Sequence, residues 1–202
     1  MMKLYYSSTS PFVRKVNVFA AEVGLDTQIE WVKTNPWQAE ELLTAENPLS
    51  KIPTLKTDDG MILYDSSVIC EYLDSLHCGK KLIPPEGDAH WKALSLQALG
   101  DGILESGIAR FLERKRDTAL QSKDWDSLQK KSIERSLDYL ENSISEWSEM
   151  ELNIGLLCIA CTLGWLDFRI PDQNWREKRP ALTTWFEQFS TRSSMVNTQP
   201  KE

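Results

Sequence analysis

The first part of the chain alternates short strand-like runs with amphipathic helical stretches. Residues 3–6 and 28–32 read as strands, and residues 53–56 and 61–64 read as a hairpin around Asp58-Asp59-Gly60. Residues 11–24 carry apolar positions at helical spacing, with Pro11 suited to the first turn and Gly24 to the end. Further helices are expected over residues 37–46 and behind the capping run at residues 65–67. This pattern predicts an α/β domain around a small sheet over residues 1–77.

The periodicity breaks at residues 78–88, where two prolines and two glycines stand close together. We expect this stretch to be an interdomain linker. Beyond it, apolar positions between Trp91 and Phe111 mark one long helix, and those at 133, 137, 140, 144 and 147 mark another. Residues 156–168 are apolar almost all round, which is typical of a helix at the centre of a bundle, and Pro180 begins a last amphipathic helix. The pattern predicts an all-helical domain over residues 89–202.

Composition narrows the class of protein. The 202 residues carry a formal net charge of -7, and their basic residues are mixed with acids, which speaks against a nucleic-acid partner. The locally basic run 110–116 is read as a solvated helix end in preference to a phosphate-binding patch. No run approaches the roughly 18 apolar residues that cross a bilayer, and the N-terminus lacks a signal-peptide pattern. We expect a cytoplasmic protein with no membrane partner and four reduced cysteines.

A hydroxyl at a helix start is the first candidate for chemistry. Ser10 stands immediately before Pro11, so its Oγ and the first free N–H groups of the helix can converge on one anion. A thiol with a pKa of about 8.5 would be helped to ionise there. The alternative is that Ser10 is simply an N-cap. Ser8 and Thr9 supply neighbouring hydroxyls that could serve in its place.

Several segments share an order and spacing with a known family. They are Ser10-Pro11-Phe12-Val13-Arg14-Lys15, Asn47-Pro48-Leu49-Ser50-Lys51-Ile52-Pro53-Thr54-Leu55, Tyr64-Asp65-Ser66-Ser67-Val68-Ile69-Cys70-Glu71-Tyr72-Leu73 and Leu163-Gly164-Trp165-Leu166-Asp167-Phe168-Arg169. Together they resemble the cytosolic glutathione S-transferase family, and specifically a bacterial serine-type subgroup. The resemblance implies an N-terminal thioredoxin-like α/β domain, an all-α C-terminal bundle and a homodimer. It also implies a cytoplasmic detoxification enzyme that takes glutathione as co-substrate and a small hydrophobic electrophile.

The resemblance also implies a role for each candidate residue. Ser10 would activate the glutathione thiol, with Phe12 beside it, and a cis Ile52-Pro53 bond would let the Ile52 backbone pair with the cysteine portion. Asp65 and Ser66 would hold the γ-glutamyl group, although the family often has Glu in place of Asp65, and both could instead be caps. Three more side chains are candidates: Lys51 or Lys33 for the glycine carboxylate, and Asp101 for the γ-glutamyl group across a dimer interface. The lysines could equally be solvated, and Asp101 could be a solvent-facing or capping acid.

Some residues invite functions that we do not assign. Cys158 and Cys161 form a C-x-x-C inside an apolar helix, which favours two core cysteines over a redox pair. His77 and His90 are read as surface residues, and no metal is expected. Trp37 and Arg110 are candidates for the border of the co-substrate cleft.

The start of the central helix departs from the family pattern. The family commonly has a reciprocal capping box where this chain has Asn153 and Leu156, so Leu156→Asp is expected to stabilise the fold by roughly 0.5 to 1 kcal/mol. Two other functions remain open: a binding or regulatory module with little turnover, and a glutathione-dependent peroxidase or dehalogenase.

Overall fold

The computed structural model describes residues 1–38 and 41–202, which form two compact units. The first unit contains Met1–Ile83 and Ser193–Glu202, and the second contains Pro84–Arg192. The expected domains were residues 1–77 and 89–202; here residues 78–88 are divided between the two units, and residues 193–202 belong to the first unit. Residues 78–83 join the first unit, where the buried Asp74 carboxylate accepts hydrogen bonds from the amides of Leu82 (3.0 Å) and Ile83 (3.1 Å).

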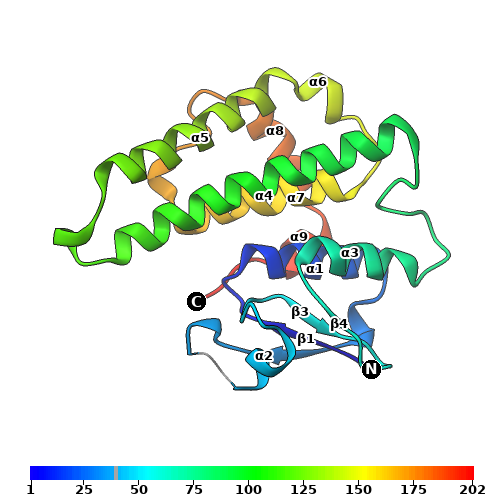
Figure 1. Ribbon diagram of the computed structural model, residues 1–202. Coiled ribbons are helices and arrows are strands. Elements are labelled where there is room, and N and C mark those ends of the chain that lie inside the picture. Colours follow the sequence, from blue (N-terminus) through cyan, green and yellow to red (C-terminus); the bar gives the residue numbers. More distant parts are fainter. Residues whose placement is uncertain (39–40) are drawn as a thin grey trace. The chain divides into compact units, whose positions relative to one another are not determined.

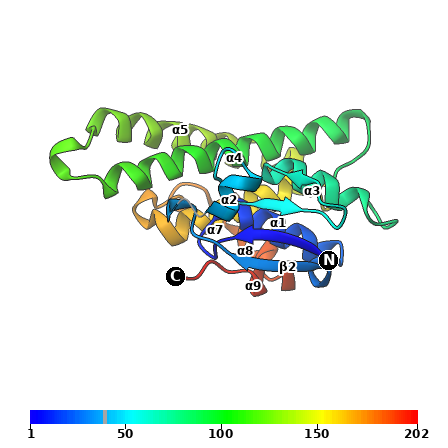
Figure 2. The ribbon, with the colours of Figure 1, turned by 60° about the horizontal axis from the view of Figure 1, so that its bottom comes forward.

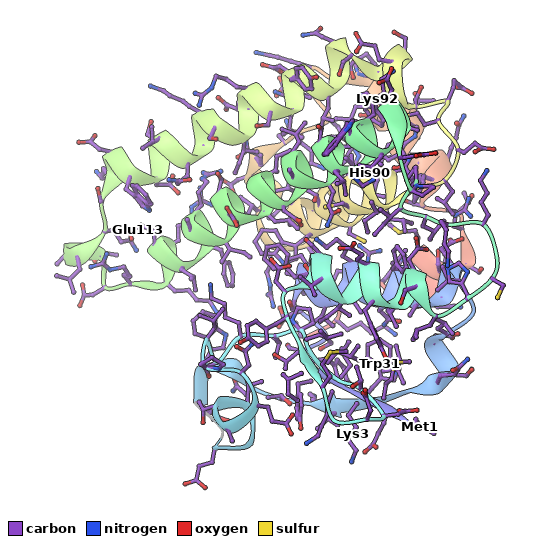
Figure 3. The ribbon with its side chains drawn as sticks, turned by 45° about the vertical axis from the view of Figure 1, so that its right-hand side comes forward. Met1, Lys3, Trp31, His90, Lys92 and Glu113 are labelled. Carbon is purple, nitrogen blue, oxygen red and sulfur yellow. The ribbon has the colours of Figure 1, made fainter. Side chains whose placement is uncertain are left out.

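The first unit is built on a four-stranded mixed sheet, as predicted. Its strands are β1 (Met2–Tyr6), β2 (Ile29–Lys33), β3 (Thr54–Lys56) and β4 (Ile62–Leu63), in the order β2-β1-β3-β4. Strand β2 is parallel to β1, while β3 is antiparallel to both β1 and β4 (Figures 1 and 2). Lys3 and Trp31 lie on the neighbouring strands β1 and β2 (Figure 3), and the Trp31 ring meets the Tyr6 ring edge-on at 5.8 Å. This is the sheet of a thioredoxin-like domain.

Helices cover this sheet. Helices α1 (Pro11–Glu22) and α3 (Ser66–Ser75) lie on one side of it, and α2 (Glu41–Glu46) lies on the other (Figures 1 and 2). The expected helix over 37–46 is instead a 3-10 helix, Pro36–Gln38, followed by α2, and residues 39–40 lie outside the described residues. The short helix α9 (Ser193–Asn197) packs on α1, where Arg14 Nη2 donates to the Met195 carbonyl at 3.1 Å.

The described residues of the second unit form helices and no strands, as the periodicity predicts. Its helices are α4 (Gly87–Lys115), α5 (Lys123–Asn142), α6 (Ile144–Trp147), α7 (Ile154–Arg169) and α8 (Pro180–Phe189). Most of the sixteen residues of α7 are buried, as expected for the central helix of a bundle. The prediction of a single helix through positions 133–147 is wrong. Helix α5 ends at Asn142, and Ser143, with φ -101° and ψ 10°, separates it from α6.

Close approach of backbones defines the contact between α4 and α7. A Cβ added to Gly100 would stand 2.7 Å from Cys158 Sγ, and one added to Gly155 would stand 2.6 Å from the Ala93 carbonyl oxygen. Side chains larger than hydrogen therefore do not fit at these two crossing points without movement. Trp147, Trp165 and Trp185 are buried, which confirms their expected place in the core.

The two histidines expected at the surface are half-buried, and both have polar partners. His77 Nε2 lies 3.0 Å from the Asp74 carboxylate, with 13% of the histidine side chain exposed. His90, near the start of α4 (Figure 3), has Nδ1 2.7 Å from the Pro84 carbonyl oxygen and its ring edge-on to Trp91. Both histidines thus help to hold chain turns next to helix ends. Among the described residues, no helix combines the length and apolar character needed to cross a membrane, and no cluster of metal-ligating side chains occurs.

Candidate functional site

The register of the sheet brings four chain segments to one edge. Because β1 and β2 are parallel and Tyr6 pairs with Lys33, the carboxyl ends of both strands lie at the same edge. Strand β3 runs the other way, so Thr54, its first residue and the partner of Tyr5, also lies there. Strand β4 reverses again and ends at this edge with Leu63. The segments that follow β1, β2 and β4 and the segment that precedes β3 therefore meet.

Most of the predicted glutathione-binding residues belong to these four segments. Ser10 follows β1 and begins α1, Lys33 ends β2, Ile52-Pro53 precedes β3, and Asp65-Ser66 follows β4 and begins α3. The ends of two helices and a turn are thus placed at one edge by strand pairing alone. Ser10 and Asp65, which are 55 positions apart in the sequence, are brought to the same edge in this way.

Ser10 is the N-cap of α1. Its Oγ accepts a hydrogen bond from the Val13 amide at 3.3 Å, and its carbonyl accepts from the Arg14 amide at 3.0 Å. Pro11 occupies the first helical turn, where its missing N–H leaves no donor unsatisfied. A hydroxyl that accepts a hydrogen bond keeps its own hydrogen free to donate. Capping by Ser10 and donation to a bound sulfur are therefore compatible.

The hydroxyls next to Ser10 have partners of their own. Ser7 Oγ lies 3.1 Å from Thr9 Oγ1, and the Ser7 carbonyl accepts from the Ser10 amide at 3.2 Å. Ser8 is exposed. Ser7 and Thr9 thus shape the turn between β1 and α1, whereas Ser10 stands at the helix end itself.

A tyrosine at the end of β1 is held in its neutral form. The pKa of Tyr5 is raised to about 12, first by burial and then by the hydrogen bond and negative charge of Glu46. Its side chain is almost completely buried, at 3% exposure. Tyr5 is therefore a structural member of the sheet and not an ionising group at its edge.

The turn before β3 contains a cis Ile52-Pro53 bond, which confirms the bond geometry expected from the resemblance. Pro53 is buried and Ile52 is half-buried, while Lys51 is exposed. The Lys51 carbonyl oxygen accepts hydrogen bonds from Asn47 Nδ2 at 3.1 Å and from Thr54 Oγ1 at 2.8 Å. Buried side chains thus hold the backbone of the turn, while the Lys51 side chain remains exposed.

The start of α3 presents one buried and one exposed polar side chain. Asp65 is the N-cap, and its Oδ1 accepts from the Ser67 amide at 3.0 Å. Ser66 is the first helical residue and is only 2% exposed. Its backbone N–H is among those that have no acceptor within a helix. The capping role that the sequence left open for Asp65 is therefore present, and it leaves the second carboxylate oxygen available.

The remaining predicted residues are less closely tied to this edge. Phe12 is half-buried in the first turn of α1, and the ammonium of the fully buried Lys15 lies 5.8 Å from its ring centre. Lys33 is exposed at the end of β2. Asp101 belongs to the second unit, where its Oδ1 lies 3.3 Å from Cys158 Sγ on α7.

The structure corrects the expectation for Arg110. Its side chain is 1% exposed, and it donates to Asp126 at 3.0 Å and 3.3 Å and to the side-chain oxygen of Gln173. Arg110 therefore ties α4 to α5 and to the 3-10 helix Pro171–Gln173, and it does not border a co-substrate cleft. Trp37, by contrast, is 75% exposed.

The basic run 110–116 is also not simply solvated. Arg114 makes a two-pronged ion pair with Asp172 at 2.8 Å and 2.9 Å, and Arg116 pairs with Glu113 at 3.1 Å. Glu113 lies near the end of α4 opposite to Lys92 (Figure 3). Its pKa is lowered, chiefly by the hydrogen bond from the Ser122 amide. Arg114 thus joins α4 to the 3-10 helix Pro171–Gln173, whereas Arg116 pairs within the end of α4.

Cys158 and Cys161 are completely buried in α7, which confirms that they are core cysteines. Asn153 caps this helix by accepting from the amides of Gly155 at 2.9 Å and Leu156 at 3.2 Å.

A measurable cavity in the first unit lies away from the predicted residues. It has a volume of about 320 Å³ and is lined by residues of α1, α9 and the turn between α1 and β2, among them Asn17, Glu22, Asp26 and Ser194. Asn17 and Glu22 belong to the later turns of α1, whereas Ser10 begins this helix. The candidate site is therefore formed by the segment ends at the sheet edge and not by this cavity.

Asn47 and Thr54, for which the sequence pattern indicated no role, hold the turn that contains Ile52. Both side chains are completely buried. Their need for internal partners follows from their burial, which the tertiary structure decides and the sequence alone did not indicate.

Comparison with known proteins agrees with this arrangement. Residues 9–76 match the family model described as "Glutathione S-transferase, N-terminal domain". An Escherichia coli K12 protein described as uncharacterized GST-like protein YibF is 33% identical over 201 residues, which cover 98% of each chain. A glutathione transferase family member of Pseudomonas fluorescens Pf-5, solved with bound glutathione, is 37% identical, with a TM-score of 0.97 over 100% of both chains.

A second solved structure gives the same picture. The glutathione S-transferase of Methylobacillus flagellatus KT, solved with glutathione, is 32% identical, with a TM-score of 0.93 over 100% of both chains. Sequence similarity and structural similarity both extend over the whole chain, including the helical second unit. The chain therefore belongs to the glutathione S-transferase family.

Proposed function

We propose that this protein is a glutathione transferase in which Ser10 activates the thiol of bound glutathione for attack on a small hydrophobic electrophile. The observation that carries the proposal is the place of Ser10. Its hydroxyl stands at the N-terminus of α1, at the sheet edge where Ile52-Pro53 and Asp65-Ser66 also lie. The 37%-identical Pseudomonas protein holds glutathione, and that supports glutathione as the ligand here.

The proposed chemistry begins with ionisation of the thiol. The Ser10 hydroxyl donates a hydrogen bond to the sulfur, and the positive end of α1 favours the negative charge. Both effects stabilise the thiolate relative to the thiol, so the proton leaves to solvent at a lower pH. The thiolate then attacks an electrophilic carbon, a carbon–sulfur bond forms, and the leaving group departs with the bonding electrons.

The other segments position the tripeptide in this proposal. The Ile52 backbone pairs with the cysteine portion, Ser66 and Asp65 receive the γ-glutamyl carboxylate and ammonium, and Lys51 or Lys33 receives the glycine carboxylate. Phe12 packs beside the sulfur, and Asp101 of a second subunit reaches the γ-glutamyl group. Binding at several points fixes the sulfur relative to the electrophile, which is the main rate advantage of such a site.

The test compares wild-type protein with Ser10→Ala. Glutathione affinity is measured by calorimetry, the pKa of bound glutathione by thiolate absorbance, and turnover with an activated aromatic chloride. We expect affinity to change little, the thiol pKa to rise and the rate to fall by about 100-fold. An unchanged rate would contradict the role of Ser10, and the same assay on Thr9→Ala would then identify the neighbouring hydroxyl.

The same measurements distinguish the alternatives. Tight glutathione binding without turnover on any electrophile would indicate a binding or regulatory module. Turnover confined to peroxides or haloalkanes would indicate a peroxidase or dehalogenase that uses the same thiolate.

We also propose that the protein is a homodimer in the cytoplasm, acting in detoxification. Large apolar side chains are exposed in both units, such as Val68 at 43% on α3 and Trp91 at 66% on α4, and a dimer would cover such residues. The free cysteines are consistent with a reducing compartment. Light scattering of the wild-type protein and of Val68→Glu tests the assembly, with a dimer expected for the former.

A further inference from the structure

The turn before Ile52-Pro53 encloses a buried polar triangle. Asn47 Nδ2 donates both to the Lys51 carbonyl oxygen at 3.1 Å and to Thr54 Oγ1 at 2.8 Å. Thr54 Oγ1 donates in turn to the same Lys51 oxygen at 2.8 Å. Asn47 Oδ1 accepts from the Leu49 amide at 2.9 Å, so every polar atom of this side chain is used inside the turn.

The triangle fixes the direction of one peptide plane. Lys51 and Ile52 are joined by a trans peptide bond, since the cis bonds among the described residues are at Ile52-Pro53 and Tyr64-Asp65. In a planar trans peptide, the N–H of Ile52 points opposite to the C=O of Lys51. Two hydrogen bonds that pull the Lys51 oxygen into the core therefore aim the Ile52 N–H away from the core. They also polarise this peptide group, which makes its N–H a better donor.

We infer that Asn47 and Thr54 are positioning residues for glutathione, because they hold the Lys51-Ile52 peptide plane in the orientation that pairs with the cysteine carbonyl of the tripeptide. This inference rests on the proposed function. Neither side chain touches the ligand, since both are completely buried. Their effect passes through the backbone alone.

A purely structural role is the competing explanation, and β3 supplies a matched control. Thr57 follows the other end of β3, is also buried, and braces the hairpin turn by accepting from the Met61 amide at 2.9 Å and donating to Asp59. Thr54→Val and Thr57→Val thus each remove a hydroxyl group from a buried threonine of the same unit. Thr54→Val affects the turn before β3, whereas Thr57→Val affects the hairpin turn after it.

The experiment measures glutathione affinity by calorimetry and steady-state kinetics for wild type, Thr54→Val, Thr54→Ser and Thr57→Val. We expect Thr54→Val to raise the Kd and the KM for glutathione about tenfold. A change of this size corresponds to the binding free energy of about one hydrogen bond. The kcat at saturating glutathione should change by less than about twofold. Thr54→Ser, which restores the hydroxyl, should return the Kd to the wild-type range, and Thr57→Val should lower thermal stability without changing the Kd.

The outcomes separate the inference from the proposed function. No binding of glutathione by wild-type protein would overturn both. Binding by wild type with an equal Kd for Thr54→Val, or an equal rise in Kd for Thr57→Val, would overturn the inference alone. Should Thr54→Val not fold, Asn47→Ser is measured in the same way, because it removes both amide donors of the triangle and carries the same expected rise in Kd.

Discussion

At the scale of single residues, short polar side chains next to helix starts hold the molecule's turns in place. Ser10, Asp65 and Asn153 each accept hydrogen bonds from amides two or three residues ahead. Such bonds satisfy donors that a helix cannot satisfy itself. At Ser10 and Asp65, the same geometry leaves polar atoms at the sheet edge that can face a ligand.

Leu156 shows how burial overrides a local rule. It occupies the position where a capping box would place an acid, but it is 3% exposed. We therefore expect Leu156→Asp to destabilise the protein by about 2 kcal/mol, since the loss of a buried leucine exceeds the gain of one capping bond. This reverses the expectation from sequence. Urea unfolding checks it, with Asn153→Ala as the companion variant that should cost about 1 kcal/mol.

Asp126 should make stability depend on pH. Burial acts to raise its pKa, but the hydrogen bonds and positive charges of Arg110 and Arg114 outweigh burial, and the pKa lies below its usual value. A lowered pKa gives stability that is present above the unfolded value of about 3.9 and is lost as pH falls through the folded value. We expect Asp126→Asn to lose about 2 kcal/mol at pH 7, because it removes the carboxylate that pairs most closely with the buried Arg110 and leaves it only the more distant Asp172 carboxylate, at 3.9 Å.

The pH dependence of that difference is the decisive measurement. The gap between wild type and Asp126→Asn should narrow as urea unfolding is repeated from pH 5 towards pH 3. Asp124→Asn, at an exposed carboxylate on the same helix, is the control and should change little at any pH. A constant gap would show that the loss at pH 7 is not electrostatic.

At the scale of elements, α4 and α7 approach each other through glycine. Helix periodicity predicted both helices but not their contact, because it does not encode which helix a face meets. The close approach arises where Gly100, Gly107 and Gly155 have no side chain to hold the helices apart. At Gly107, an added Cβ would stand 2.8 Å from the Trp165 ring.

Two glycine substitutions should have opposite effects. Gly155→Ala should destabilise the protein by about 1 to 3 kcal/mol, because the new methyl group meets the Ala93 carbonyl. Gly102→Ala on α4 has nothing within 4 Å of the added Cβ and should stabilise by up to about 1 kcal/mol through helix propensity. Thermal unfolding of both variants is the measurement. Equal shifts of either sign would contradict the close packing at Gly155.

At the scale of the whole molecule, the chain begins and ends in the same unit. Residues 193–202 follow the helical unit but pack with the first one, where Met195 is buried and its carbonyl accepts from Arg14. Ser194 also donates to Glu22 near the end of α1. The C-terminal segment thus braces the helix whose other end carries Ser10.

Removal of that segment should weaken the first unit. A chain ending at Arg192 loses the buried Met195 and leaves Arg14 and Glu22 without these partners, so we expect a loss of about 3 kcal/mol. Deletion of residues 199–202 alone is the control and should have little effect. Chemical unfolding compares them, and equal stability of all three chains would show that α9 does not brace α1.

The sequence by itself determined the features that depend on near neighbours. The strands, most of the helices, the caps at Ser10, Asp65 and Asn153, and the hairpin at Gly60 follow from periodicity and from side chains that reach only a few residues along the chain. Their order was enough to indicate the family. Only the tertiary structure decided which segments meet: the sheet edge that gathers Ser10 with Ile52 and Ser66, the burial of Arg110 and the return of residues 193–202 to α1. These depend on contacts between distant residues, which local patterns do not specify.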